Sequence, residues 1–395
     1  MNPLEISLED LRKQRSAKWA TYPADVIPAW IAQMDFHAAE PVKAVLRGIV
    51  EQEDFGYPRR EGRQPAVVLA EAFGEWMMKR FTWNADPALV VPVSDLAQAK
   101  LAAIMAFSDP GDGVVLQTPC YPPMLEAIQE TGRRFIDNPL VEGGGGDGTR
   151  AALDLEGLGR SLDGRSRMIL LCNPHNPTGR VFEAPELEAL VALAEKHDLI
   201  IVSDEIHKDL VYPGHRHIPL ASLSPEAARR VVTITSPAKS FNIPGLRCGI
   251  MHFGSAELKA RFHQRIPRRL LGQPSIAGMD AAITAWRQGD AWLVQVLAQL
   301  TEGRAQFAEA VGTSLPGLRW HQPEATYFAW LDCREAGLPG SAADFFLKEA
   351  RVAFSPGESF SPAYKDFVRV NFATSSAIRQ EIIARMREAL LGFKR

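Results

Sequence analysis

The sequence predicts an α/β fold with a mostly parallel sheet and a second, smaller α+β domain. From about residue 42, apolar runs typical of buried strands alternate with helical patterns, which indicates parallel βαβ units. Three of these runs, at 168–172, 199–202 and 231–235, each lead into a polar segment. After about residue 274 the pattern changes to long helices. A chain of 395 residues is long for one core, so two domains are expected.

Local signals justify the elements of the first half in turn. Ser7, followed by Asp10, predicts a short capped helix near the N-terminus. Ser94 is a residue type that caps helices, and it precedes an apolar helical stretch over 96–107. Residues 113–117 then have the composition of a strand.

In the second half, the segment over 291–311 is rich in Leu, Val, Ala and Gln and predicts a long helix. Strand-like runs follow at 327–331 and 367–372, and the last helix carries an apolar stripe of Ile378, Ile382, Met386 and Leu390. We therefore expect residues 46–285 to form the large domain. Residues 1–45 and 286–395 are expected to form the small one.

The four glycines over 143–146 resemble a phosphate loop, but they lack a following Lys-Ser or Lys-Thr pair and a strand-loop-helix context. We interpret them as a flexible connector. The chain likewise has no strand leading into a G-x-G-x-x-G loop, which argues against a nicotinamide dehydrogenase.

Composition excludes several classes of protein. A net charge of −3 with 46% hydrophobic and 23% charged residues is typical of a soluble globular protein and offers no basic stripe for nucleic acid. No apolar stretch approaches the ~18 residues needed to cross a bilayer, and the N-terminus does not resemble a signal peptide. The four cysteines are scattered without a CxxC pair, so no metal site is expected. These features predict a cytoplasmic protein with neither a membrane nor a nucleic-acid partner.

Polar residues follow the three apolar runs. Asn176 follows the first run, Asp204 the second and Lys239 the third. Ligands of open α/β sheets bind at the carboxyl ends of the strands, so these three side chains are expected to meet there. An amine, a carboxylate and an amide together suit pyridoxal 5′-phosphate (PLP), an aldehyde cofactor with a pyridine ring.

Each of the three residues has a role in that hypothesis and a plainer alternative. Lys239 would hold the aldehyde and later carry the proton at Cα, although a lone lysine is often a solvated loop residue. Asp204 would pair with the pyridinium nitrogen, or it could cap a helix. Asn176 would donate to the ring oxygen, or it could serve only its Asn-Pro-Thr-Gly turn.

Further residues are candidates for the ring and for the substrate. His207 could face the same ring oxygen or merely pack, and Tyr121 could stack on the ring or pack under a turn. Strand alternation turns Arg369 away from its neighbours Val368 and Val370. It would grip a substrate carboxylate with two hydrogen bonds, or otherwise face solvent.

The phosphate would lie at the start of the helix over 96–107, where the amides of Asp95 and Leu96 and the hydroxyl of Ser94 are available. Ser236 and Arg247 would complete the cup, Arg247 with a charged forked donor. Because a carboxylate is unfavourable beside a phosphate, Asp95 is expected to point away. Ser94 could equally be a helix cap that binds no ligand.

Taken together, these motifs resemble the fold-type I PLP enzymes of the class I/II aminotransferase family. Within that family the chain is most similar to the MalY/PatB-like subgroup of cystathionine β-lyases, which are C–S lyases. The segments that carry the resemblance are Ile31–Phe36, Phe55–Tyr57, Asn176–Gly179, Ser203–His207, His217–Pro219, Lys239–Arg247 and Thr326–Asp332.

The resemblance implies a seven-stranded, mostly parallel sheet and a small domain built from both termini. It also implies a homodimer with shared active sites, in which Tyr57 would reach into the partner's site. Two residues depart from the family pattern: Ala238 replaces the usual serine before the lysine, and Asp95 replaces a neutral residue of the phosphate cup.

The expected reaction is β-elimination from an S-substituted L-cysteine such as L-cystathionine, which gives a thiol, pyruvate and ammonia. An aminotransferase would use the same groups and remains the nearest alternative. A regulatory protein that keeps the fold is a third possibility, although no helix-turn-helix segment is appended to the N-terminus.

Overall fold

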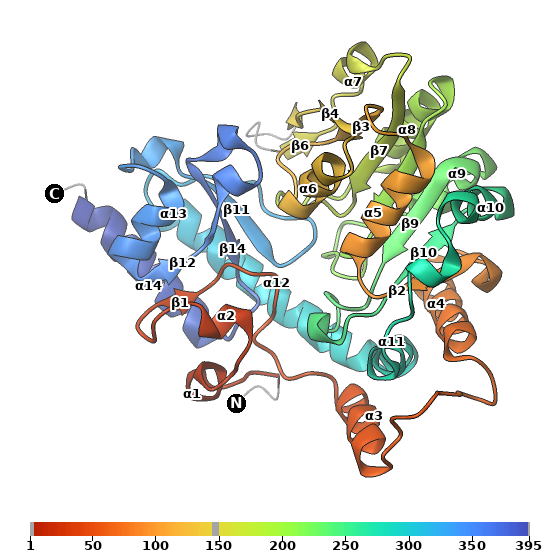
Figure 1. The fold of residues 1–395 in the computed structure, drawn as a ribbon. Helices are drawn as coiled ribbons and strands as arrows, with labels where there is room; N and C mark the ends of the chain where they lie inside the picture. The colour runs from red at the N-terminus through yellow and green to blue at the C-terminus, as the bar shows by residue number, and fades with distance from the viewer. Residues whose placement is uncertain (1–3, 144–149, 394–395) are drawn as a thin grey trace.

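The computed structural model describes residues 4–143 and 150–393, and a seven-stranded sheet lies at the centre of its larger part (Figure 1). Every neighbouring pair in the sheet is parallel except the two pairs that β10 makes. The mostly parallel seven-stranded sheet is thus confirmed. Across the sheet the strands are β2 (Val90–Val93), β10 (Gly249–Phe253), β9 (Val231–Thr235), β8 (Ile200–Asp204), β7 (Ser166–Cys172), β3 (Gly113–Leu116) and β4 (Arg134–Asp137).

Register explains why the polar residues meet. Cys172 at the end of β7 pairs with Asp204 at the end of β8, and Asp204 in turn pairs with Ile234 on β9. The three strands therefore end at the same edge, and the chain delivers Asn176, Asp204 and Lys239 there.

Helices cover both faces of this sheet (Figure 1). Alternate strand residues such as Ile201 and Val202 belong to two different apolar clusters, because successive side chains point to opposite faces. One face packs α5 (Leu96–Phe107), α6 (Pro122–Glu130) and α10 (Ala256–Arg265). The other packs α4 (Pro65–Phe81), α7 (Leu155–Ser161), α8 (Ala184–Lys196), α9 (Pro225–Arg230) and α11 (Ile276–Gln288). Helix α3 (Glu40–Glu51) lies against α11.

The smaller part joins the two ends of the chain. β11 (Phe328–Asp332), β14 (Phe367–Asn371) and β13 (Ser355–Pro356) form an antiparallel sheet. Near the N-terminus, β1 (Ile27–Pro28) pairs with β12 (Val352–Ala353), and the Asn371 amide donates to the Ala29 carbonyl at 2.8 Å. The helices of this part are α1 (Leu8–Arg12), α2 (Ala17–Ala20), α12 (Asp290–Thr313), α13 (Ala342–Phe345) and α14 (Ser376–Phe393).

The structure differs from the sequence prediction at the N-cap of α5, and it describes only part of the glycine run over 143–146. The N-cap of α5 is Asp95, not Ser94: Asp95 Oδ1 accepts from the Gln98 amide at 2.8 Å, while the Ser94 amide donates to Gln98 Oε1 at 3.0 Å. Both residues are good caps, and the helix itself spans Leu96–Phe107 as expected, so only the assignment of the cap changes. Of the glycine run, Gly143 ends β5 (Val141–Gly143), which forms a hairpin with β6 (Arg150–Ala152), and the other three lie outside the described residues.

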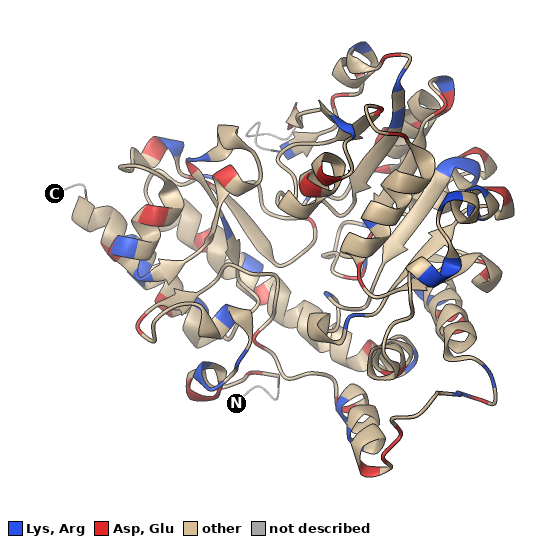
Figure 2. Ribbon diagram, viewed as in Figure 1, with Lys and Arg blue, Asp and Glu red and all other residues tan. Residues whose placement is uncertain are grey.

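Charged residues are interspersed over the fold, with Lys and Arg beside Asp and Glu on most elements (Figure 2). Within residues 4–143 and 150–393, no helix combines the length and apolar character that a bilayer span requires.

Candidate active site

A cavity of about 270 Å³ opens at the carboxyl ends of β7, β8 and β9, beside the first turn of α5. Ten of the twelve predicted site residues line it, all except Tyr57 and Arg369. They are Ser94, Asp95, Leu96, Tyr121, Asn176, Asp204, His207, Ser236, Lys239 and Arg247.

Lys239 reaches this cavity from the turn after β9, and its Nζ donates to the Ala32 carbonyl at 3.0 Å. Burial, together with the positive charge of Arg369, lowers the pKa of Lys239 to about 8. A fraction of the amine is therefore neutral near pH 7, as attack on an aldehyde requires.

Asp204 lies at the end of β8 and is buried. Its Oδ1 accepts from the Ile206 amide at 3.2 Å, which is the local turn contact. Its Oδ2 accepts from Lys100 Nζ at 3.0 Å, and this lysine is buried as well. Lys100 lies on α5 and was not among the residues predicted from the sequence.

Arg369 and Asn176 meet although they lie on different parts of the fold. Arg369 Nη1 donates to Asn176 Oδ1 at 2.9 Å, which leaves the Asn176 amide group as a donor. Arg369 Nη2 donates to the Trp30 carbonyl and to Ser355 Oγ, both at 3.0 Å.

Arg369 is buried, so the alternative of a solvent-facing strand residue is wrong. Its guanidinium carbon lies 4.2 Å from the ring centre of Phe328 and 4.9 Å from that of Phe360. Burial lowers the pKa of Arg369 to about 10, which still leaves it charged near pH 7.

His207 and Tyr121 flank the cavity. The His207 ring packs edge-on against Tyr327 and Phe328, and its Nδ1 is buried without a hydrogen-bond partner in the described part of the chain. Burial, with Lys239 and Arg369 nearby, holds the pKa of His207 well below its usual range, so its ring is neutral. Tyr121 is 39% exposed, and Lys100 Nζ lies 5.8 Å from the centre of its ring.

The predicted phosphate cup contains an internal ion pair. Asp95 Oδ2 accepts from Arg247 Nη2, so the carboxylate that was expected to point away from the phosphate is paired with a residue of the predicted cup. Ser236 Oγ donates to the Cys248 carbonyl at 2.6 Å and accepts from the Ala238 amide at 3.0 Å. Ser236 thus lies at the cavity with its hydroxyl donor engaged, whereas Arg247 uses only Nη2 and keeps further donors for a ligand.

An N-terminal strap, residues 32–36, crosses the site. Asn242 fastens it, because its Oδ1 accepts from the Met34 amide and its Nδ2 donates to the Met34 carbonyl, both at 2.9 Å. The Ala32 carbonyl that receives Lys239 belongs to this strap. Backbone contacts of this kind leave no side-chain signal in the sequence, although Asn242 stands within the lysine motif.

Tyr57 lies far out on the segment between α3 and α4 and is fully exposed in the single chain, at 106% of its reference area. It does not line the cavity of its own chain.

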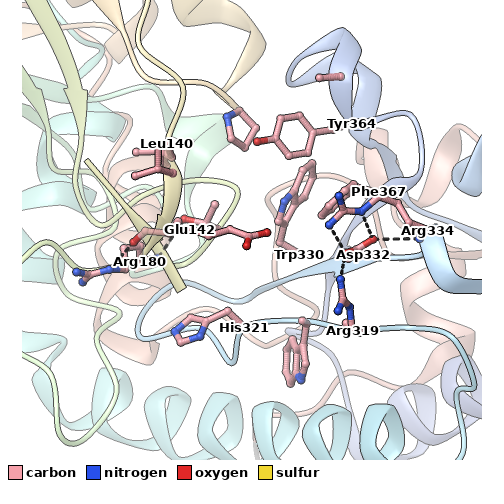
Figure 3. A pocket seen from close by; sticks show the side chains of 16 residues that line it. Leu140, Glu142, Arg180, Arg319, His321, Trp330, Asp332, Arg334, Tyr364 and Phe367 are labelled. Atoms are coloured by element: carbon pink, nitrogen blue, oxygen red, sulfur yellow. Dashed lines mark hydrogen bonds and ion pairs between the residues drawn. The ribbon is translucent and has the colours of Figure 1, made fainter. Parts of the chain in front are cut away.

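A second cavity, of about 360 Å³, lies between the β5–β6 hairpin and the face of β11 and β14 (Figure 3). Its charged side chains largely satisfy one another: Asp332 accepts from Arg334 at 2.7 Å and lies 3.4 Å from Arg319. No lysine lines it. The chemistry predicted from the sequence therefore belongs to the smaller cavity.

The residues of the smaller cavity fit PLP. His207 Nδ1 in the cavity, and Nε of Arg369, which is bonded to Asn176 at the edge of the cavity, are buried polar atoms left without partners among the described residues. Such atoms call for a ligand or water. An amine, a carboxylate and a free amide donor surround the same space. The Asp95–Arg247 pair and the engaged hydroxyl donor of Ser236 are features that oppose the fit.

Residues 32–386 match the family model described as aminotransferase class I and II. The chain belongs to this family. It is 33% identical to "Cystathionine beta-lyase PatB" of Bacillus subtilis, over 93% of each chain. The solved structure of OvoB is 36% identical, with a TM-score of 0.90 over 99% of this chain and 98% of that one.

Cystalysin from Treponema denticola, whose structure contains pyridoxal 5′-phosphate, is 26% identical, with a TM-score of 0.90 over 100% of this chain and 99% of that one. Membership of the family and the fold expected of it are thereby confirmed.

Proposed function

We propose that this chain is a PLP-dependent C–S lyase that cleaves the Cβ–S bond of S-substituted L-cysteines such as L-cystathionine. The observation that carries the proposal is one cavity that holds the Lys239 amine and Asp204, with Asn176 bonded to Arg369 at its edge. The lyase name of the Bacillus subtilis relative, which matches along 93% of its own length, supports the choice of reaction.

When bound, PLP supplies an electron sink for the charge that develops at the substrate Cα. Lys239 would hold the aldehyde carbon, and its amine, once the substrate amine has taken that place, would accept the Cα proton. Asp204 would face the ring nitrogen, and the Asn176 amide would donate to the ring oxygen. The neutral His207 ring can serve the same oxygen through Nδ1.

The substrate carboxylate would bind at Arg369, which is held between Phe328 and Phe360 and therefore loses little freedom on binding. Loss of the Cα proton and of the thiolate leaves 2-aminoacrylate, which water converts to pyruvate and ammonia. Tyr121 lies at the open side of the cavity, where it can stack on the ring or guide the proton.

The phosphate would lie at the first turn of α5, against the amides of Asp95 and Leu96. Arg247 would turn from Asp95 toward the phosphate, and Ser236 and Ser94 would add hydroxyl donors.

The test is to load the purified protein with PLP and supply L-cystathionine and a panel of S-alkyl cysteines. Thiol and pyruvate should appear in equal amounts, and borohydride should fix the cofactor to Lys239. Absence of both products with every conjugate contradicts the lyase proposal. Exchange of the amino group with a 2-oxo acid, without thiol release, would instead indicate the aminotransferase.

We further propose a cytoplasmic homodimer in which Tyr57 completes the partner's site, and the division into domains at residues 1–45, 46–285 and 286–395. Tyr57 and its neighbour Phe55, which is 69% exposed, form an apolar projection that a second copy could bury. Lys239→Ala and Tyr57→Ala proteins should each be inactive. Mixing them after reversible dissociation should restore activity, because one site of the mixed dimer receives both intact residues. No recovery from a mixture that does form mixed dimers contradicts the shared site.

A further inference from the structure

Lys100 is a buried cation that the proposed reaction does not use. It is 3% exposed and projects from the second turn of α5 into the cavity that holds Lys239. A buried ammonium is costly unless it is paired, and its hydrogen-bond partner in the structure is Asp204, at 3.0 Å. Burial disfavours the charged form of Lys100, but the charge and hydrogen bond of Asp204 outweigh this and raise the pKa of Lys100 above its ordinary value.

Lys100 also lies beside Tyr121, with its Nζ 5.8 Å from the ring centre. It therefore touches the group that would face the ring nitrogen and lies close to the one that would stack on the ring. Asp204 has lone pairs to spare, because Oδ1 accepts only the Ile206 amide and Oδ2 only Lys100 in the described structure. The carboxylate can accept a third donor without releasing Lys100.

We propose that Lys100 remains paired with Asp204 when PLP is bound. The ammonium group of Lys100 then partly neutralises the negative charge that Asp204 presents to the ring nitrogen. This inference rests on the proposed function, and it assigns Lys100 as a positioning residue that acts through Asp204.

The charge near the ring nitrogen sets how strongly the ring withdraws electrons. With Lys100 beside Asp204, the ring nitrogen is protonated less completely than it would be beside an unpaired carboxylate. The ring therefore stores the negative charge from Cα less well. Elimination tolerates this, because the departing thiolate carries the electrons away. Amino-group exchange is more sensitive to this loss, because the ring must keep the electrons until a proton reaches the cofactor carbon. Lys100 therefore favours elimination over exchange.

The test compares Lys100→Met, which keeps the length of the side chain and removes its charge, with Lys100→Arg, which keeps the charge. Each protein is loaded with PLP labelled with ¹⁵N in the ring, and the nitrogen signal is recorded by NMR. The Met variant should move the signal toward that of protonated pyridine. The Arg variant should stay close to the wild type.

Two further readouts follow from the same substitution. In cofactor-free Lys100→Met, Asp204 has lost its cation and can pair fully with the protonated ring nitrogen. This variant should therefore bind PLP about tenfold more tightly than the wild type. The share of turnovers that end with the cofactor in its amine form should rise about tenfold. Arg379→Met is the control, because Arg379 is another buried cation, pairs with Glu302 at 3.3 Å and does not line the cavity. It should lower stability and leave the nitrogen signal unchanged.

An unchanged nitrogen signal in Lys100→Met, or weaker binding of PLP, overturns the role of Lys100. The NMR and binding measurements need no turnover. A wild-type protein that binds PLP but releases no thiol from any conjugate thus defeats the lyase proposal, and the spectra still decide the role of Lys100.

Discussion

Arg369 on β14 donates a 2.9 Å hydrogen bond to Asn176, which follows β7 and lies 193 positions earlier in the sequence. The bond joins the small antiparallel sheet to the edge of the large one. The proposed carboxylate clamp and the proposed donor to the ring oxygen are therefore one hydrogen-bonded unit. A change in either residue should affect the binding of both substrate and cofactor.

Arg369→Lys should raise KM for an S-substituted cysteine by about 10- to 100-fold, because lysine cannot form the forked contacts of arginine. The lost bond to Asn176 should also weaken PLP binding. Steady-state kinetics and a cofactor titration measure the two effects. Arg319→Lys, in the second cavity, is the control and should change neither. An unaltered KM in Arg369→Lys would place the substrate carboxylate elsewhere.

Lys239→Ala should lower the rate of elimination by at least ~10³-fold, since it removes both the covalent anchor and the group that moves the proton. The absorbance band of the lysine-bound cofactor should disappear with it. Lys43→Ala, at a half-exposed lysine of α3 paired with Glu40, should leave both unchanged. Retention of the band in Lys239→Ala would show that another amine holds the cofactor.

The rate at which cofactor-free protein captures PLP should follow the fraction of the Lys239 amine that is neutral at each pH. Burial and Arg369 lower the pKa of Lys239 to about 8. The neutral fraction, and with it the capture rate, should rise about tenfold per pH unit below that value and level off above it. Stopped-flow absorbance follows the reaction. Arg369→Leu removes a positive neighbour, so the plateau should begin at higher pH. A wild-type plateau only near pH 10.5, the ordinary value for lysine, would contradict the lowered pKa.

Asp95→Asn should strengthen PLP binding by about tenfold, because it removes a carboxylate from the proposed phosphate site and frees Arg247. Asparagine still caps a helix, so the melting temperature should change little. Asp95→Ala separates the two effects: it should also free Arg247, but loss of the cap should cost about 1 kcal/mol. Weaker binding in both variants would mean that the Asp95–Arg247 pair orders the cup.

The buried carboxyl group of Glu324 should make the free energy of unfolding depend on pH. It is 2% exposed and contacts Arg150 at 2.7 Å, Arg180 at 2.9 Å and the Val181 amide at 2.8 Å. Burial alone would raise the pKa of Glu324, but contacts with His321, Val181 and the arginines outweigh it and lower the pKa well below 4.5.

A carboxyl group with a lowered pKa in the fold stabilises it above pH 4.5, and this stabilisation is lost as the pH falls. Glu324→Gln should therefore cost about 3 kcal/mol of unfolding free energy at pH 7. The difference from the wild type should narrow below pH 4.5. Urea denaturation at several pH values measures it, and a constant difference across that range would contradict the assignment.

The sequence was sufficient for the residues that strands deliver. Asn176, Asp204 and Lys239 follow buried runs whose parallel register could be anticipated, so their meeting at one edge was predictable. Arg369 was predictable as a residue that faces away from its apolar neighbours, but its burial between two aromatic rings was not. That burial depends on how the small sheet docks on the large one, which no local pattern encodes.

Other features depended on choices between equivalent local signals. Ser94 and Asp95 are adjacent residues that both cap helices, and only the side-chain contacts with Gln98 and Arg247 decide between them. Lys100 stands in an apolar helix, where a single lysine ordinarily marks the solvent face. Its partner lies 104 positions away, so sequence spacing gave no reason to connect them.

The strap over the lysine has a consequence for synthesis. Lys239 bonds to Ala32, and residues beside Ala32 are held by Asn371 through the Ala29 and Ile31 carbonyls, at 2.8 and 2.7 Å. An early stretch of the nascent polypeptide thus meets Asn242 first and finds Asn371 only after almost the whole chain has left the ribosome. The strap over the pocket can be held by all of its partners only near the end of translation, and newly made protein should acquire its cofactor stably only after release.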